Sequence, residues 1–118
     1  MRLATFVGVG AIVALAACKN GYGNGGGCSP SATQVCMVSK AFSPLNRTVI
    51  HGTTVQWVNG DSFDHTVTSD PGSGETYDQT VVGGGTFSFT FNTAGTFTYH
   101  CQIHGAPGTG MHGTITVN

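Results

Sequence analysis

A short stretch of the sequence holds three side chains that could bind one metal ion. Cys101, His104 and Met111 offer a thiolate, an imidazole and a thioether. A soft sulfur, a nitrogen of intermediate softness and a weaker second sulfur suit copper that alternates between Cu(I) and Cu(II). His65 lies well upstream, among residues that favour a strand, and is the best candidate for a second imidazole ligand. We therefore expect a copper site built from one loop and one separate strand.

The residues around these ligands alternate as they do in β-strands. Phenylalanines alternate with polar residues, mostly hydroxyl-bearing, from 86 to 92, and after a turn at 93–95 the same period of two continues. Cys101 has the parity of Tyr99, and His65 has the parity of Val67, so both ligands should point inward. By the same count, the side chain of His100 should point outward.

The composition also favours strands. The sequence has 19 glycines, only 8% charged residues and many Thr, Val and Phe residues, which argue against helices and for short strands joined by tight turns. Further strands are expected from Val35 to a break at Pro44, at 48–50, at 53–59 and at 114–117. Strands at this spacing predict an all-β fold, an antiparallel sandwich or barrel.

The length of 118 residues predicts one domain with one core. The formal net charge of -1 and the lack of a basic patch argue against nucleic acid as a partner. The acidic residues all fall between positions 61 and 78. Such a flank could steer a basic partner, although a run of this kind is usually a solvated loop.

The first residues have the pattern of an export signal. Arg2 precedes an apolar segment from Leu3 to Ala14, and small residues lead up to Cys18. The segment 15–18 resembles the lipobox of bacterial lipoproteins, in which the cysteine carries the lipid anchor. The alternative is an ordinary secretory signal, cleaved nearby, that leaves Cys18 as a free thiol. Either interpretation predicts a signal peptide at 1–17 and a mature protein outside the cytoplasm, in the bacterial periplasm or at the cell surface.

A glycine-rich segment follows the signal. Residues 20–27 have no apolar periodicity, and a flexible chain of eight residues spans roughly 15 Å. We expect residues 18–34 to be a tether that joins a lipid anchor to a domain at 35–118. A segment without a role is the alternative.

The four cysteines fit three different tasks. With Cys18 assigned to the lipid and Cys101 to the metal, Cys28 and Cys36 remain, close in sequence and in an oxidising compartment. We predict a disulfide between them, with Cys36 on the opposite side of its strand from the apolar residues next to it. The alternative is two unpaired thiols, or one that competes for the metal.

Four motifs follow one another along the chain: Val55-x-Trp57-Val58-Asn59, Asp61-x-x-x-His65-Thr66-Val67, Phe97-x-Tyr99-His100-Cys101-x-x-His104 and Gly110-Met111-x-Gly113-x-Ile115-x-Val117. In this order they resemble the motifs of the cupredoxins, especially the plastocyanin, amicyanin and pseudoazurin branch. The resemblance covers residues 35–118. It implies a Greek-key β-sandwich and one type 1 copper held by His65, Cys101, His104 and an axial Met111. It also implies a monomer that transfers single electrons between transient redox partners and is not an enzyme.

Two features depart from the family pattern. Six residues, 105–110, separate His104 from Met111, where the most similar members have two to four. Plastocyanin-like proteins commonly have an asparagine after the first histidine ligand, and this chain has Thr66, whose hydroxyl is expected to supply a similar hydrogen bond.

We expect the electron to pass through the edge of His104, because the small residues 105–108 leave room for a weakly apolar docking patch.

The other histidines and the alternative functions fit the sequence less well. His51 should be exposed in a turn, and His112 should face outward. His100 adjoins the cysteine, as a second-copper ligand does in copper nitrite reductases, but no second domain accompanies it.

A copper carrier is the alternative function; a reductase or oxidase would need a second copper. Zinc also binds Cys and His, and the position of Met111 favours copper.

Overall fold

The computed structural model describes residues 28–118, so the predicted signal peptide, the lipid anchor at Cys18 and most of the glycine-rich tether lie outside the described residues. Within these described residues, nine strands make up the fold: β1 (Gln34–Val38), β2 (Ala41–Ser43), β3 (Asn46–Val49), β4 (Thr53–Asn59), β5 (His65–Ser69), β6 (Asp78–Val81), β7 (Thr86–Phe91), β8 (Gly95–Ala106) and β9 (Thr109–Val117). Among the described residues, no helix is long and apolar enough to cross a membrane.

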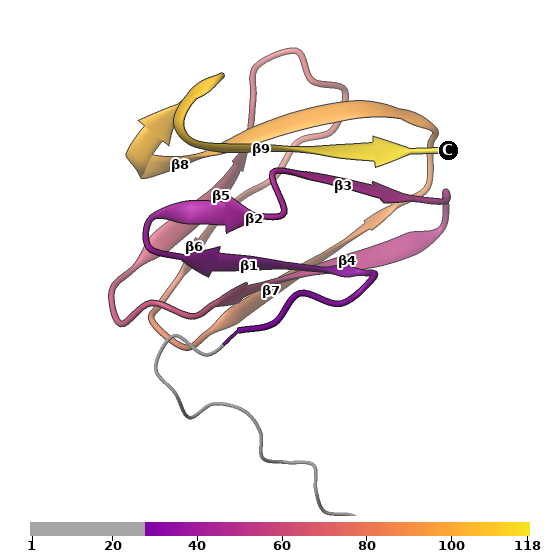
Figure 1. Cartoon of the computed structure of the whole chain (residues 1–118). Helices are drawn as coiled ribbons and strands as arrows, with labels where there is room; N and C mark the ends of the chain where they lie inside the picture. Colours follow the sequence, from indigo (N-terminus) through magenta and orange to yellow (C-terminus); the bar gives the residue numbers. More distant parts are fainter. Residues whose placement is uncertain (1–27) are drawn as a thin grey trace, which may run out of the picture.

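The strands form two sheets that pack face to face (Figure 1). One sheet has the order β2-β1-β4-β7 and the other the order β3-β9-β8-β5-β6. The expected all-β sandwich is confirmed. Most pairs are antiparallel, but β1 pairs with β4 and β3 pairs with β9 in parallel, because the chain crosses between the sheets before it returns.

Aromatic rings fill the space between the sheets. Trp57 and Tyr99 are completely buried, with their ring centroids 5.4 Å apart, and Phe42 meets Tyr99 edge-on at 4.6 Å. The alternation in 86–92 is confirmed in part, since Phe91 is buried and the other two phenylalanines are partly buried. Burying one such ring stabilises the fold by about 3 kcal/mol. The core therefore holds rigidly the strands that carry the candidate ligands.

The predicted disulfide between Cys28 and Cys36 is present, with 5.8 Å between the two Cα atoms. Cys36 lies on the opposite side of β1 from Val35 and Met37, which are both fully buried in the core. The bridge fastens the first described residue to β1.

The segment 105–110, expected to be a glycine-rich loop, is a β-hairpin tip. Gly105 pairs with Gly110 and Ala106 pairs with Thr109. Gly110 has a left-handed φ of 64°, and a Cβ on Gly105 would lie 2.3 Å from the backbone nitrogen of Met111. The two glycines let β8 and β9 approach closely, so the longer spacing brings Met111 back toward His104 instead of away from it.

His100 lies on the outer face of β8, since Tyr99 and Cys101 on either side of it point into the core. It is nevertheless buried there, with 8% of its surface exposed. Its Nδ1 lies 2.6 Å from a carboxylate oxygen of Asp70. On the neighbouring strand β9, His112 is the residue paired with it. The period of two indicates the face of a sheet, but it does not indicate which loop covers that face. His51 is exposed in a turn, as expected.

Replacing both bridged cysteines by alanine (Cys28→Ala with Cys36→Ala) is expected to lower the free energy of unfolding by about 2.5 kcal/mol, because the bridge restricts a short loop of the unfolded chain. Urea denaturation with and without a phosphine reductant measures the effect. The reductant should destabilise the wild type by a similar amount and leave the double variant unchanged. A loss below about 0.5 kcal/mol would show that the bridge contributes little.

Gly113→Ala is expected to destabilise the domain by about 1–3 kcal/mol, a typical penalty for overpacking. A Cβ at this position would lie 2.6 Å from the hydroxyl oxygen of Tyr99, whose ring is held by Phe42 and Trp57. Tyr99→Phe removes the closest of these contacts, so it should restore part of the stability of Gly113→Ala in urea denaturation. Equal stability of Gly113→Ala and wild type would contradict the packing described here.

Candidate metal centre

Three of the four predicted ligands converge at one end of the sandwich. His65 begins β5, while Cys101 and His104 lie in an irregular stretch of β8 where the pairing with β9 shifts between His100 and Gly105. The Cys101 Sγ is 3.9 Å from Nδ1 of His65 and 3.7 Å from Nδ1 of His104, and the two Nδ1 atoms are 3.1 Å apart. Among the described residues, this is the only group of three or more His, Cys, Asp or Glu side chains whose ligand atoms lie this close together.

The three side chains differ in their exposure. Cys101 and His65 are completely buried, whereas His104 is only partly buried. A buried cysteine sulfur is shielded from solvent and from oxidants dissolved in it. The partly buried imidazole of His104 connects the cluster with the surface.

Met111, the fourth predicted residue, is 1% exposed and lies near the start of β9. The hairpin places its backbone against Gly105, the residue that follows His104. The structure therefore brings Met111, on β9, to the irregular stretch of β8 that carries the candidate ligands Cys101 and His104.

Thr66 ties the two ligand strands together. Its backbone N–H donates to the Cys101 Sγ over 3.3 Å, and its hydroxyl oxygen accepts a hydrogen bond of 2.8 Å from the backbone N–H of Gln102. The expectation that the hydroxyl of Thr66 would support the ligand loop is confirmed. An N–H that donates to a thiolate also disperses its negative charge, which is one way a protein adjusts a metal–sulfur bond.

The carboxylate of Asp61 contacts the first imidazole. It lies 2.8 Å from Nε2 of His65 and also accepts the backbone N–H groups of Ser39 and Lys40. Desolvation raises the pKa of Asp61, but the hydrogen bonds from His65, Ser39 and Lys40 outweigh it, and the pKa lies below its ordinary value. With a proton on Nε2 donated to this carboxylate, the lone pair of Nδ1 is free to bind a metal.

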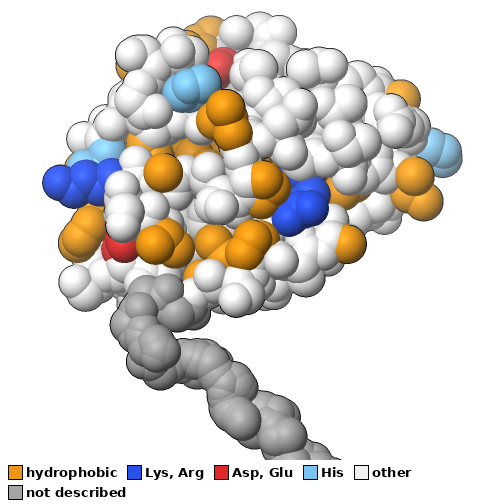
Figure 2. All heavy atoms as spheres, in the orientation of Figure 1, with side chains coloured by type: hydrophobic (Ala, Val, Ile, Leu, Met, Phe, Trp, Pro, Cys, Tyr) orange, Lys and Arg blue, Asp and Glu red, His pale blue; other side chains and the backbone are white. Residues whose placement is uncertain are grey.

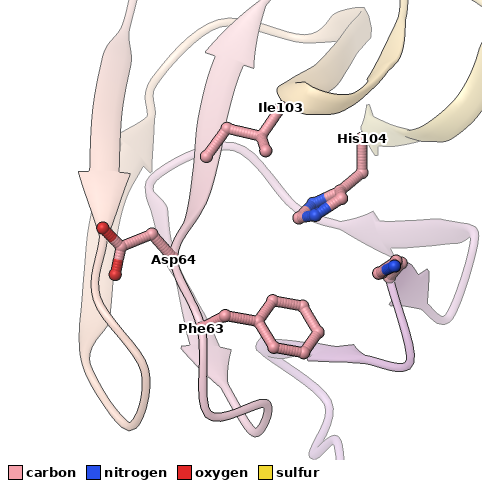
Figure 3. Close-up of a pocket in the computed structure, with 5 residues that line it drawn as sticks. Phe63, Asp64, Ile103 and His104 are labelled. Carbon is pink, nitrogen blue, oxygen red and sulfur yellow. The ribbon is translucent and has the colours of Figure 1, made fainter.

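An open pocket of about 540 Å³ adjoins His104, and its lining includes Phe63 and Ile103 (Figure 3). The Phe63 ring lies 5.2 Å from the ring of His65 and 5.6 Å from that of His104, measured between centroids. Desolvation, and then the neighbouring His65, lower the pKa of His104 below its ordinary value. In Figure 3 the carboxylate of Asp64 points away from His104.

The sequence indicated some of these neighbours and not others. The spacing Asp61-x-x-x-His65 is visible in the sequence, but the spacing alone does not indicate that the carboxylate contacts the imidazole. No pattern marked Phe63, Ile103 or Lys40, because residues in separate loops reach one pocket only after the strands pack. On the face shown in Figure 2, charged side chains are scattered among uncharged groups.

The donor set fits copper. Two imidazole nitrogens and one buried thiolate converge, and a buried thioether follows on the next strand. Soft sulfur together with imidazole is the combination found in blue-copper electron-transfer sites. His51, His100 and His112 do not belong to any such group in the described part of the chain.

Comparisons with known proteins agree with the chemistry of the site. A sequence model of copper binding proteins, plastocyanin/azurin family, matches residues 28–118. A plastocyanin of Scenedesmus fuscus is 38% identical over 85 residues, which cover 64% of this chain and 85% of that protein.

Solved structures show the same fold. A purple cupredoxin from Nitrosopumilus maritimus matches with a TM-score of 0.61 and 28% identity over 73% of this chain and 99% of that one. A Cu(I) amicyanin variant matches with a TM-score of 0.64 and 26% identity over 77% of this chain and 86% of that one. A copper nitrite reductase from Thermus scotoductus also matches (TM-score 0.65, 28% identity, 78% of this chain), but the match spans only 23% of that enzyme. The chain belongs to the copper-binding plastocyanin/azurin family, the cupredoxins, and its cofactor is one type 1 copper.

Proposed function

We propose that this protein carries single electrons between redox proteins outside the cytoplasm, with its copper held by His65, Cys101, His104 and Met111. The observation that carries the proposal is the cluster itself. A buried thiolate and two imidazole Nδ1 atoms lie within 3.9 Å of one another. Similarity to a plastocyanin supports an electron carrier over an enzyme.

The scaffold holds these side chains in place through contacts between protein groups. The Cys101 Sγ accepts the N–H of Thr66, the His65 ring is held by Asp61, and both strands belong to a packed sandwich. Bound copper supplies the change between Cu(II) and Cu(I). Because the protein fixes a geometry that both oxidation states tolerate, few atoms need to move when an electron arrives, and transfer is fast.

His104 is the proposed point of electron exchange. It is the one partly exposed member of the three-residue cluster, and it borders the pocket with Phe63 and Ile103, which are 41% and 53% exposed. A small apolar surface suits brief encounters in which one electron arrives from a reduced partner and one leaves to an oxidised partner. The docking patch that we propose is thus centred on Phe63 and Ile103 as well as on the small residues 105–108.

The proposed location is the bacterial periplasm or the cell surface, with a monomer anchored through a lipid on Cys18. The signal pattern at 1–17 motivates this proposal. The disulfide between Cys28 and Cys36 supports it, because such bridges persist in oxidising compartments.

Adding one equivalent of Cu(II) to the chain without residues 1–17 is expected to give an intense blue, green or purple colour and a narrow copper hyperfine splitting, owing to the bond with the Cys101 thiolate. Visible absorption and electron paramagnetic resonance measure both. Cys101→Ser should lose the colour and the narrow splitting. A colourless wild type with ordinary type 2 signals would contradict electron transfer and favour a copper carrier or a zinc site.

Met111→Leu is expected to keep the intense colour and to raise the reduction potential, because loss of a thioether donor destabilises Cu(II) more than Cu(I). Protein-film voltammetry measures the potential. Met37→Leu, a buried methionine of β1, is the matched control and should leave the potential unchanged. Equal potentials for Met111→Leu and the wild type would show that Met111 is not an axial ligand.

A further inference from the structure

The Asp61 carboxylate makes three contacts that join two separate parts of the molecule. Its Oδ1 accepts the N–H of Ser39 over 2.8 Å, while its Oδ2 accepts the N–H of Lys40 over 3.1 Å and lies 2.8 Å from Nε2 of His65. One side chain thus holds the β1–β2 turn and a candidate metal ligand together.

The turn that Asp61 holds is unfavourable by itself. Ser39 and Lys40 form a two-residue connection between β1 and β2, and both have left-handed backbone conformations, with φ of 54° and 60°. Such turns strongly prefer Asn-Gly, because glycine and asparagine adopt positive φ at low cost. Two non-glycine residues remain in this conformation where the surroundings stabilise it, and the carboxylate accepts both of their N–H groups.

Asp61 is itself held in place. Its backbone N–H donates to the side-chain oxygen of Asn59 over 2.9 Å. The amide nitrogen of Asn59, which is 1% exposed, donates to the carbonyl oxygens of Phe63 and Val81. The loop between β4 and β5 therefore offers the carboxylate from a fixed position.

We propose that Asp61 is the positioning residue of His65 and that the same carboxylate stabilises the Ser39–Lys40 turn. This turn lies beside the open pocket at His104, which Lys40 lines. The hydrogen bond keeps the proton of His65 on Nε2 and turns Nδ1 toward Cys101 and His104. This role rests on the proposed function, in which His65 binds copper, but the state of the His65 ring is measurable without metal.

The first variant is Asp61→Asn, compared with Glu75→Gln, which removes the same charge from a side chain that makes no hydrogen bond in the described structure. In the metal-free protein, ¹⁵N NMR of the imidazoles reports the tautomer of His65. We expect the Nε2–H form in the wild type and in Glu75→Gln, and a mixture of forms in Asp61→Asn. Cu(II) affinity should fall 10–100-fold in Asp61→Asn, the usual effect of removing a carboxylate behind a histidine ligand.

A protein with a different β1–β2 turn serves as a second background and separates the positioning of His65 from the stabilisation of the turn. Ser39→Asn with Lys40→Gly gives the turn a sequence that adopts left-handed φ without help. In this background, Asp61→Asn should cost less stability in urea denaturation than in the wild type, whereas the changes in tautomer and in Cu(II) affinity should persist. This background also provides a folded protein if Asp61→Asn alone does not fold.

Three results would overturn the proposal: an unchanged His65 tautomer in Asp61→Asn, an affinity loss that disappears in the Asn-Gly background, or an equal stability loss in both backgrounds. The first two would remove the positioning role, and the third would remove the role in the turn. If Asp61→Asn shifts the tautomer of His65 but the wild type gives no type 1 copper spectrum, the proposed function fails while the positioning of His65 stands.

Discussion

The site exists because the backbone ladder between β5 and β8 stops short. These strands pair at Thr68 with His100 and at Ser69 with Tyr99, and no further pairs follow toward His65. Over the next residues β8 is irregular, and the space that opens holds the side chains of His65, Cys101 and His104. Two hydrogen bonds of Thr66, to the Cys101 sulfur and from the Gln102 N–H, close the gap that the ladder leaves. A regular sheet would have placed His104 against a neighbouring strand.

The same opening produces the asymmetry on which the proposed function depends. His65 lies inside the sandwich, held by Asp61 and shielded by Phe63, while His104 reaches the surface at the β8–β9 hairpin. An electron can therefore enter or leave through one imidazole, while the thiolate stays protected from water. Because the rigid aromatic core is directly below, the strands that carry the donors are held in place by packing between the two sheets.

Much of this arrangement could be predicted from local pattern. The period of two placed Cys101 and His65 toward the interior, and four ordered motifs indicated the ligand set and the sandwich. The pairing of Cys28 with Cys36 followed from their proximity in sequence. In contrast, the segment 105–110 was expected to be a loop and is a hairpin tip, because the close approach of Gly105 to Met111 depends on the neighbouring strand. The burial of His100 depends on Asp70, which is distant in sequence, and was also not predictable.

The sequence by itself determined which atoms can bind the metal, because the identity and spacing of Cys101, His104, Met111 and His65 define a donor chemistry before any fold exists. It also determined the strands, since alternation is a property of neighbouring residues. Only the tertiary structure decided which imidazole is buried, which carboxylate holds it and which apolar side chains border the exposed one. The residues concerned, among them Lys40, Asp61 and Phe63, meet through contacts between separate turns and loops. The relative position of such segments is set by the packing of two whole sheets and not by any local pattern.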